Sequence, residues 1–259
     1  MLATVNDLVK LLEELMPSNL AEEWDNVGLM LGRKGKTVKK ILLALDLSKE
    51  VVEQAVAQKI DLIITHHPAI FKKLKRVVDN DWQQDLLLTL AENGIAVYSA
   101  HTNLDCVSTG VNDVLAKLLK LEDIEVLDDS NGLGRIGVVE EASLPEYAQV
   151  VKAALKADYV VVADAGKKVH KVAVCGGAGS DLIDLALAKG ADTLVTGDVK
   201  YHSAQQAVFS GLNIIDAGHQ PTELPVLEKL ADRLSLRLVE RDMDVVVNVA
   251  KETLIVRHV

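Results

Sequence analysis

Four histidines in this sequence directly follow short apolar segments, and two carboxylates come four residues after a histidine. A single histidine in such a place would suit a hydrogen-bonded loop better than a metal site, so it is the group that indicates metal binding. Imidazole nitrogens combined with carboxylate oxygens suit zinc, iron, manganese, nickel or cobalt, and not magnesium or calcium alone. The side chains concerned are His66, His67, His101, His219, Asp105 and Glu223.

The adjacent pair His66 and His67 indicates two ions instead of one. Neighbouring side chains on an extended chain point to opposite sides, and Pro68 favours extended backbone in the residue before it. Two imidazoles held in that way reach a single ion poorly, but they can serve two ions a few ångströms apart. A carboxylate that bridges the ions would then offset their repulsion, and either Asp105 or Glu223 could supply it.

The segment around Pro221 predicts a second pair of ligands. Proline fits the first turn of a helix, so His219 and Glu223 would lie one turn apart near that start. The two side chains would then converge on one ion. Together with the adjacent histidines, this spacing favours a site with two metals.

These residues need a parallel sheet that brings the carboxyl ends of its strands together. Continuous apolar runs alternate with helical patterns, which is typical of an α/β fold with helices on both faces of each sheet. Ligands in such sheets gather beyond the carboxyl ends of the strands. The predicted strands are 40–45, 61–65, 95–99, 172–175, 193–196 and 213–215, and the predicted helices between them are 49–58, 83–92, 181–190 and 203–209.

An internal repeat relates the two halves of the chain. Residues 40–67 align without a gap 131 positions later, and residues 95–105 align 118 positions later. The second alignment pairs His101 with His219 and also pairs the carboxylates that follow them. We therefore expect two pseudo-symmetric α/β lobes with a metal site between them.

The expected lobes have the boundaries 1–125 and 169–259, intertwined into one functional unit. The stretch 126–168 between them is expected to be an ordered connector, because it contains a helix that starts near Pro145 and a strand over 159–163. A helix over 224–234 and strands over 245–249 and 254–256 are expected after the second lobe's ligands.

Composition excludes several classes of protein. The 259 residues carry 28 basic and 38 acidic side chains, a formal charge of -10, and only 3% aromatic residues. This balance works against nucleic-acid binding over the surface. Cys106 and Cys175 are too far apart for a zinc ribbon or a disulfide framework. No apolar run approaches the roughly 18 residues of a membrane span, so no membrane partner and a cytoplasmic location are expected.

Three further features could take part in chemistry. The glycine-rich segment 176–180 between a strand and a helix suits a tight turn, and less well a phosphate cradle. Cys106 beside Asp105 suits a packing residue better than a nucleophile. Asp198, Lys200 and His202 could transfer protons or hold an anionic substrate group, or equally form a network of caps and ion pairs around the site.

At these residues the chain resembles the YbgI-like family, the NGG-one-interacting-factor-three-like proteins with a dinuclear metal centre. Its bacterial members are commonly labelled "GTP cyclohydrolase 1 type 2 homolog". The matching stretches span nearly the whole chain in the order of the family. They are WDNVGL at 24–29, DLIITHHPAI at 61–70, AHTNLD at 100–105, TGDVKYH at 196–202 and DAGHQPTE at 216–223.

The resemblance implies two divalent metals per chain and a toroidal homohexamer of two-domain chains. It implies that His101 lies close to the metals without binding them directly. It implies no inserted domain between the halves, since the connector is short. The ligands that it implies are His66, His67, Asp105, His219 and Glu223.

The resemblance does not identify a reaction, because a fold and a metal site do not specify a substrate. A two-metal site suits hydrolysis of a small nucleotide ring or a phosphoester. The leading hypothesis is therefore a metal-dependent hydrolase. The alternative from another class is a metal-binding or metal-delivery protein, or an assembly scaffold, without turnover.

Overall fold

A computed structural model describes residues 2–257 of the chain and divides it into two compact units. Unit 1 comprises Met1–Val107 and Leu227–Thr253, and unit 2 comprises Ser108–Val226 and Leu254–Val259. These boundaries differ from the expected ones. The stretch 126–168 belongs to unit 2, where its strand β6 pairs with β8, and most of helix α10 returns to unit 1.

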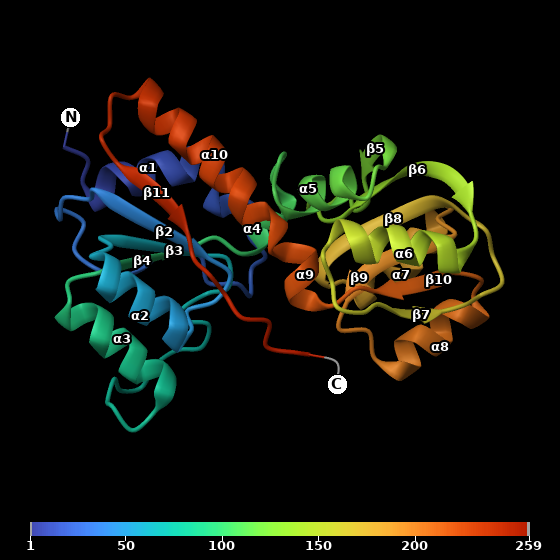
Figure 1. Ribbon diagram of the computed structural model, residues 1–259, viewed down its shortest axis with the longest axis horizontal. Helices are drawn as coiled ribbons and strands as arrows, with labels where there is room; N and C mark the ends of the chain where they lie inside the picture. The colour runs from blue at the N-terminus through green and yellow to red at the C-terminus, as the bar shows by residue number, and fades with distance from the viewer. Residues whose placement is uncertain (1, 258–259) are drawn as a thin grey trace. The chain divides into compact units, whose positions relative to one another are not determined.

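Unit 1 is a mixed sheet covered by helices on both faces (Figure 1). Its strands have the order β1-β4-β3-β2-β11, with β1 antiparallel and the others parallel. In Figure 1, α1 and α10 lie on one face and α2 and α3 on the other. The elements are α1 (Val5–Leu15), η1 (Ser18–Leu20), β1 (Gly28–Leu31), β2 (Lys40–Ala44), α2 (Lys49–Gln58), β3 (Leu62–Thr65), α3 (Trp82–Glu92), β4 (Ala96–Ser99), α4 (Thr102–Cys106), α10 (Pro225–Glu240) and β11 (Val246–Val249).

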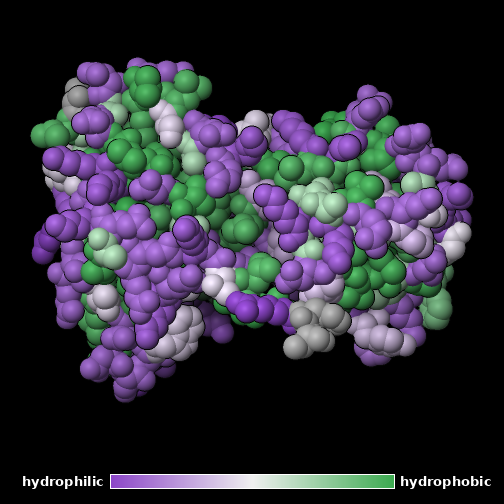
Figure 2. Space-filling view, viewed as in Figure 1, coloured by the Kyte–Doolittle hydropathy of each residue, from purple (hydrophilic) through white to green (hydrophobic). Residues whose placement is uncertain are grey.

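Alternation along the strands explains how unit 1 fills both faces. Leu42, Ile63 and Val97 pack with the buried side chains of α2 and α3. On β4, the neighbouring Tyr98 is fully buried and donates its hydroxyl to Glu13 of α1 (3.2 Å). Figure 2 shows a mostly hydrophilic surface over α2 and α3, as expected for helices whose apolar residues point inward.

Unit 2 contains the larger sheet, in the order β5-β6-β8-β9-β10-β7. Strands β8, β9 and β10 are parallel, and the strands outside them pair antiparallel. The elements are α5 (Val111–Leu118), β5 (Glu122–Val126), β6 (Arg135–Ala142), α6 (Leu144–Ala154), β7 (Val161–Ala163), β8 (Val169–Ala178), η2 (Ser180–Leu182), α7 (Ile183–Ala188), β9 (Thr193–Gly197), α8 (Tyr201–Phe209), β10 (Asn213–Asp216) and α9 (His219–Glu223).

Alternation on β8 separates two apolar layers. Val172 and Val174 pack with residues of α5 and α6, whereas Ala173 and Cys175 pack with residues of α7 and α8. The predicted α/β class, with helices on both faces of two sheets, is therefore confirmed.

The first alignment of the internal repeat is reproduced by the hydrogen bonds of the two sheets. Ile41 pairs with Leu62 on β2 and β3, and 131 positions later Val172 pairs with Thr193 on β8 and β9. Side-chain hydrogen bonds repeat after 131 positions as well. Asp61 accepts the backbone N–H groups of residues 39 and 40, and Asp192 accepts those of residues 170 and 171. A repeat of specific side-chain contacts supports duplication of one α/β unit.

The second alignment is shifted by one residue in the structure. Leu62 pairs with Ala96 in unit 1, but the matching Thr193 pairs with Asn213 in unit 2, which is an offset of 117 instead of 118. The short helices after these strands, α4 and α9, start 117 positions apart as well. His219 is therefore the first residue of its helix, whereas His101 precedes its helix as the N-cap. The pairing of His101 with His219 was wrong by one position.

Two other expectations differ from the structure. Residues 176–178 continue strand β8, so the glycine-rich segment is not simply a turn. Residues 254–256 form no strand. The sequence patterns also did not indicate β1, β5, β6 or α5, whose polar or short segments lack a clear period.

Candidate metal centre

His66 and His67 lie in the bend that follows strand β3. The His66 ring is buried, and its Nδ1–H donates to the carbonyl of Ala100 (3.0 Å). The His67 ring donates from Nδ1 to Oδ1 of Asp46, which follows strand β2 (2.9 Å). Because carbonyl and carboxylate oxygens only accept hydrogen bonds, both rings carry the proton on Nδ1 and leave Nε2 as the ligand atom.

The sequence indicated that the adjacent rings of His66 and His67 point to opposite sides of the chain. In the structure they do not. Their centroids are 5.0 Å apart, with 46° between the ring planes. The strand ends at Thr65, so strict alternation no longer applies to the two residues beyond it. His66 and His67 therefore face a common space in unit 1.

His101 joins this pair as a third imidazole. The ligand atoms of His66, His67 and His101 all lie within 4.8 Å of one another, a spacing at which they could hold a metal ion. His101 is the N-cap residue of α4, and its Nδ1–H donates to Oδ1 of Asp25 (2.9 Å). The structure thus places His101 in a group of side chains that could hold an ion.

Asp105 belongs to α4, whose residues are all buried, and it faces His66. Its Oδ1 atom is 3.6 Å from Nε2 of His66. Two donor atoms bound about 2.1 Å from one tetrahedral ion lie about 3.4 Å apart, so this separation suits a shared metal. The carboxylate is buried, which favours a cation beside it over solvent.

The second pair of predicted ligands lies on α9 in unit 2. Nε2 of His219 is 3.3 Å from Oε1 of Glu223, one helical turn later, and the Glu223 side chain is buried. Pro221 lies between them in the helix, as its position predicted. The Nδ1–H group of His219 donates to Oδ2 of Asp198 (2.7 Å). This pair has a similar separation to His66 with Asp105 (3.3 and 3.6 Å) and uses the same ring nitrogen.

A glycine makes room for Glu223. A Cβ atom built on Gly177 of β8 would lie 2.2 Å from Oε1 of Glu223 and 3.2 Å from Nε2 of His219. The Gly177 N–H donates to Thr222 Oγ1 (2.9 Å), which ties β8 to α9 at this point. The glycine-rich segment therefore forms a cradle for the ligands of unit 2, a role that the sequence did not reveal.

One feature is shared by the four imidazoles that are candidate ligands. Each has its Nδ1 atom 2.7–3.0 Å from an oxygen acceptor, three times a carboxylate and once a backbone carbonyl. Histidines that bind metals almost always donate the other ring N–H in this way, because the hydrogen bond fixes the tautomer and the ring orientation. The donor set, its spacing and its outer partners therefore fit divalent transition metals.

Two of these outer partners, Asp25 and Asp46, were missed as site residues. Asp46 follows the carboxyl end of β2, so the rule that located the histidines could have found it. Asp25 belongs to the WDNVGL stretch, but its distance from His101 in sequence hides the contact. Burial alone would raise the pKa of Asp25, but hydrogen bonds from His101 and Thr102 outweigh it and hold that pKa far below its usual value.

The C-terminal segment of unit 1 supports Asp46. The Glu252 carboxylate accepts the backbone N–H groups of Leu45 (2.7 Å) and Asp46 (3.1 Å). Burial raises the pKa of Glu252 despite these hydrogen bonds. The turn that presents Asp46 to His67 is thereby fixed from a segment more than 200 residues away in sequence.

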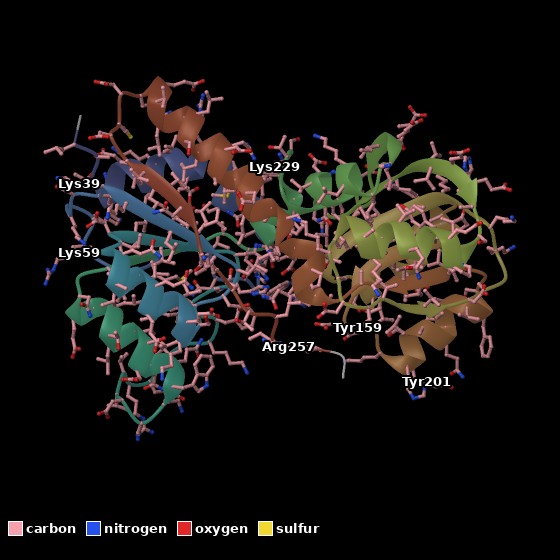
Figure 3. All side chains as sticks on the ribbon, in the orientation of Figure 1. Lys39, Lys59, Tyr159, Tyr201, Lys229 and Arg257 are labelled. Carbon is pink, nitrogen blue, oxygen red and sulfur yellow. The ribbon has the colours of Figure 1, made fainter. Side chains whose placement is uncertain are left out.

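Three further residues were predicted to transfer protons or to hold an anionic group, and each of them has different surroundings in the structure. Asp198 accepts the His219 hydrogen bond with a left-handed backbone, φ 54°. Lys200 is the exposed N-cap residue of α8. The exposed ring of His202 packs edge-on against Tyr201, which points outward from unit 2 (centroids 5.3 Å apart; Figure 3). The structure thus joins Asp198 to a candidate ligand, whereas chemical roles for Lys200 and His202 stay predictions.

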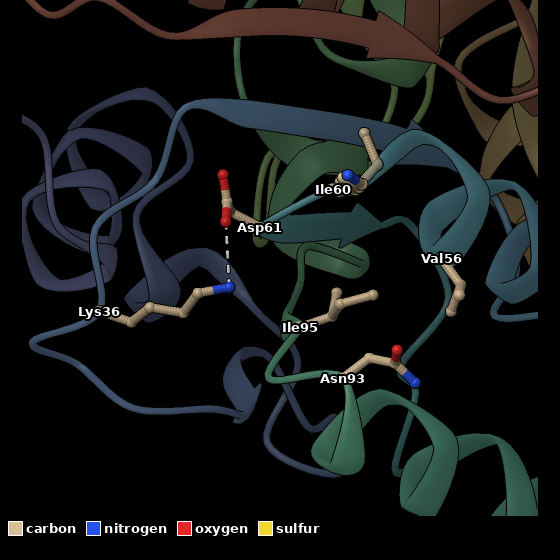
Figure 4. A pocket seen from close by; sticks show the side chains of 7 residues that line it. Lys36, Val56, Ile60, Asp61, Asn93 and Ile95 are labelled. Atoms are coloured by element: carbon tan, nitrogen blue, oxygen red, sulfur yellow. Dashed lines mark ion pairs between the residues drawn. The ribbon is translucent and has the colours of Figure 1, made fainter.

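A small cavity of about 160 Å³ lies at the opposite edge of the unit 1 sheet (Figure 4). Its lining includes Asp61 and Ile95, which precede strands β3 and β4, and an ion pair joins Lys36 to Asp61 (3.0 Å). The candidate ligands follow the carboxyl ends of the same strands. This cavity is therefore separate from the candidate metal centre.

Fold and donor groups together define an α/β protein with histidine and carboxylate groups that could hold a metal ion. The family model of Duf34/NIF3 (NGG1p interacting factor 3) matches residues 3–253, so the chain belongs to this family. This confirms the resemblance found in the sequence. In the described part of the chain, no helix is long and apolar enough to cross a membrane.

Curated relatives and solved structures agree with this assignment. The chain is 37% identical over 255 residues to a "GTP cyclohydrolase 1 type 2 homolog" of Clostridium perfringens, covering 96% of both chains. It is 39% identical over 234 residues to the protein of that name from Lactococcus lactis, covering 89% and 91%. A Bacillus cereus protein related to NIF3 matches with a TM-score of 0.92 at 27% identity, covering 98% of each chain.

Proposed function

We propose that this chain binds two divalent metal ions and uses them to hydrolyse a small nucleotide or a phosphoester. The proposed ligands are His66, His67, Asp105, His219 and Glu223. The observation that carries the proposal is the shared arrangement of the histidines, each with Nδ1 donating to an oxygen and Nε2 left as the ligand atom. The names of the relatives, GTP cyclohydrolase homologs, agree with a hydrolytic reaction on a nucleotide.

Two ions are proposed because the donors form two pairs. His66 with Asp105 and His219 with Glu223 each have the separation of two ligands on one ion, 3.6 and 3.3 Å. Bound divalent ions lower the pKa of a water ligand and polarise an oxygen of the substrate. The metals proposed are zinc, iron, manganese, nickel or cobalt, the ions that suit imidazole and carboxylate together.

The residues around the donors would orient them and handle protons. Asp46 and Asp198 hold His67 and His219 in the tautomer that presents Nε2. His101, oriented by Asp25 and close to the other two histidines, is placed to take up or release a proton at Nε2 during hydrolysis. Whether it also binds an ion is decided by the metal content of a His101→Ala variant, which falls only if His101 is a ligand.

The proposal is tested by metal content and turnover of the same samples. Wild-type protein would be reconstituted with each candidate metal and measured by elemental analysis, then incubated with nucleotides and phosphoesters. Asp105→Ala and His219→Ala should each lose about one ion per chain and all turnover. His170→Ala is the matched control, because His170 also donates from Nδ1 to a carbonyl (2.7 Å) but is not a proposed ligand.

Two outcomes would contradict the proposal in different ways. Clearly fewer than two ions per chain after reconstitution would rule out the dinuclear site. Turnover that is unchanged in both ligand variants would rule out the hydrolytic mechanism. Two bound ions without any turnover, together with transfer of metal to an apo-protein, would favour the metal-delivery alternative.

We further propose, from the family resemblance, that the chain assembles into a homohexamer and works in the cytoplasm. Light scattering of the metal-loaded protein measures the assembly directly. A mass of one chain, about 28.0 kDa, would contradict the hexamer.

A further inference from the structure

An exposed aromatic pair lies next to the three-histidine group of unit 1. The Trp24 ring is 60% exposed and the Phe71 ring 47%, and their centroids are 6.1 Å apart with 70° between the planes. Trp24 also contacts His101 in the same edge-on manner, at 6.1 Å. The rings of Phe71 and His101 thus both stand at a steep angle to the Trp24 ring. Trp24 and Phe71 lie together although only 3% of the residues in the chain are aromatic. Two exposed rings in contact form a small apolar patch, which is a candidate binding surface in a way that a single exposed ring is not.

The backbone holds this pair in place. Asn26, two residues after Trp24, donates its side-chain amide to the carbonyl of Ile70, next to Phe71. Ala69 donates its N–H to Ser99 Oγ at the end of β4 (3.1 Å). Both ends of the aromatic pair are therefore anchored to the frame that also carries His67 and His101. A rigid aromatic surface costs little entropy when a ligand binds to it.

A basic segment follows Phe71 immediately. Residues 72–76 contain four cationic side chains and no acidic one, in a protein with a net charge of -10. All four are exposed, and in the described part of the chain the structure gives none of them a carboxylate partner. They are Lys72, Lys73, Lys75 and Arg76. Of the acidic residues that follow, Asp81 is already engaged in capping α3 through the N–H groups of residues 83 and 84.

We propose that Trp24 and Phe71 form a stacking subsite for a planar heteroaromatic ring beside His101, and that segment 72–76 binds the phosphates attached to that ring. This inference rests on the proposed function and narrows its substrate to an anionic nucleotide, as opposed to a phosphoester without a ring. Stacking on an indole face is tolerant of the identity of the base, whereas unpaired cations select for negative charge. The subsite thus gives a strongly acidic protein a local means of holding an anion near the metals.

Binding of three probes to the metal-loaded full chain separates the two parts of this subsite. Calorimetric titration would use GTP, guanosine and inorganic tripolyphosphate. Trp24→Leu should weaken GTP and guanosine about tenfold or more, because stacking is lost, and leave tripolyphosphate unchanged. The double variant Lys72→Ser, Lys73→Ser should weaken GTP and tripolyphosphate and leave guanosine unchanged.

Matched controls come from the same unit. Trp82→Leu removes another exposed indole (71% exposed), at the start of α3, and should leave all three affinities unchanged. Lys39→Ser with Lys59→Ser removes two lysines from the outer edge of unit 1 and should also have no effect (Figure 3). Circular dichroism and metal content should match the wild type in every variant, since the substituted side chains are exposed.

The outcomes keep this inference separate from the proposed function. Equal GTP affinity in Trp24→Leu and Trp82→Leu, or no saturable binding of GTP and guanosine to the wild type, would overturn the stacking subsite. Binding with the expected variant pattern but without any product would leave the subsite standing and overturn the hydrolytic function. Nucleotide turnover with an unchanged KM in Trp24→Leu would overturn the subsite alone.

Discussion

Gly177 and Glu223 are in such close contact that any side chain at position 177 would occupy the place of the carboxylate. A Cβ atom there would lie 2.2 Å from Oε1 of Glu223, the oxygen that faces Nε2 of His219 at 3.3 Å. The glycine lies on strand β8 and the carboxylate on helix α9, so the candidate ligand pair of unit 2 depends on two elements at once. The arrangement explains why a glycine occupies position 177, one residue before strand β8 ends.

Gly177→Ala should displace Glu223 and remove about one metal ion per chain, while unit 1 keeps its ligands. The φ of +64° adds backbone strain of about 1 kcal/mol for a residue with a side chain. Elemental analysis after reconstitution measures the loss. Gly166→Ala is the matched control, because it has a φ of +73° but nothing within 4 Å of an added Cβ atom. Equal metal content in the two variants would show that Glu223 tolerates the clash.

Asp198→Asn should weaken metal binding about 10- to 100-fold without unfolding unit 2, because loss of an outer carboxylate lowers the basicity of its histidine ligand. Asparagine tolerates the left-handed backbone at this position, so the charge is the main change. Competition with a chromogenic chelator measures the affinity. Asp123→Asn is the control, an exposed aspartate with φ 49° in the same unit. An affinity within twofold of the control would exclude an outer role for Asp198.

Much of the fold and of the candidate metal centre follows from patterns visible in the sequence, and the rest depends on contacts between distant segments. The apolar runs of β2, β3, β8 and β9 and the offset of 131 were sufficient to predict the parallel part of each sheet, because strand period and repeat reinforce each other. The candidate histidines were predictable because they follow the carboxyl ends of strands β3, β4 and β10.

The one-residue shift after β10 was not predictable, since only the strand register reveals it. Asp25 and Gly177 were missed for a related reason. Their roles come from contacts 76 and 46 residues away in sequence, to His101 and Glu223, which no local period encodes. Antiparallel strands such as β5, with mostly polar residues, likewise gain their structure from pairing with β6 and not from their own pattern.

Removal of metal should lower the thermal stability of the protein, because ions that bind only the folded state stabilise it in proportion to the logarithm of their concentration. A concentration of about 100 times the Kd adds about 2.7 kcal/mol per site. For a chain of this size, chelation is expected to lower the Tm by roughly 5–10 °C for each ion removed. Differential scanning calorimetry with and without chelator measures the change, and the variant Asp105→Ala should show a smaller one. A Tm that does not respond to chelator or to added metal would argue against ligands in the folded state.

The metal-free protein should lose stability in acid partly through Asp25. Burial of this carboxyl opposes ionisation, but the hydrogen bonds from His101 and Thr102 prevail and keep its folded-state pKa well below the 3.8 of an exposed aspartate. When the pKa of a carboxyl is lower in the folded state than in the unfolded state, ionisation of that carboxyl stabilises the fold. The stabilisation is complete at pH values above the unfolded-state pKa, and it is lost as the pH falls from there towards the folded-state pKa. The contribution of Asp25 is therefore complete at neutral pH and declines below about pH 4.

Asp25→Asn should accordingly destabilise the chelator-treated protein by about 1–3 kcal/mol at pH 7, since hydrogen bonds within a buried network are lost. The difference from wild type should shrink as the pH falls from about 4 towards 2, because the wild-type carboxyl then becomes protonated too. Urea unfolding at a series of pH values measures both quantities. Asp79→Asn, at an exposed aspartate of the same unit, should follow the wild-type curve. A constant difference between Asp25→Asn and wild type across this range would show that the Asp25 charge is not what stabilises the His101 turn.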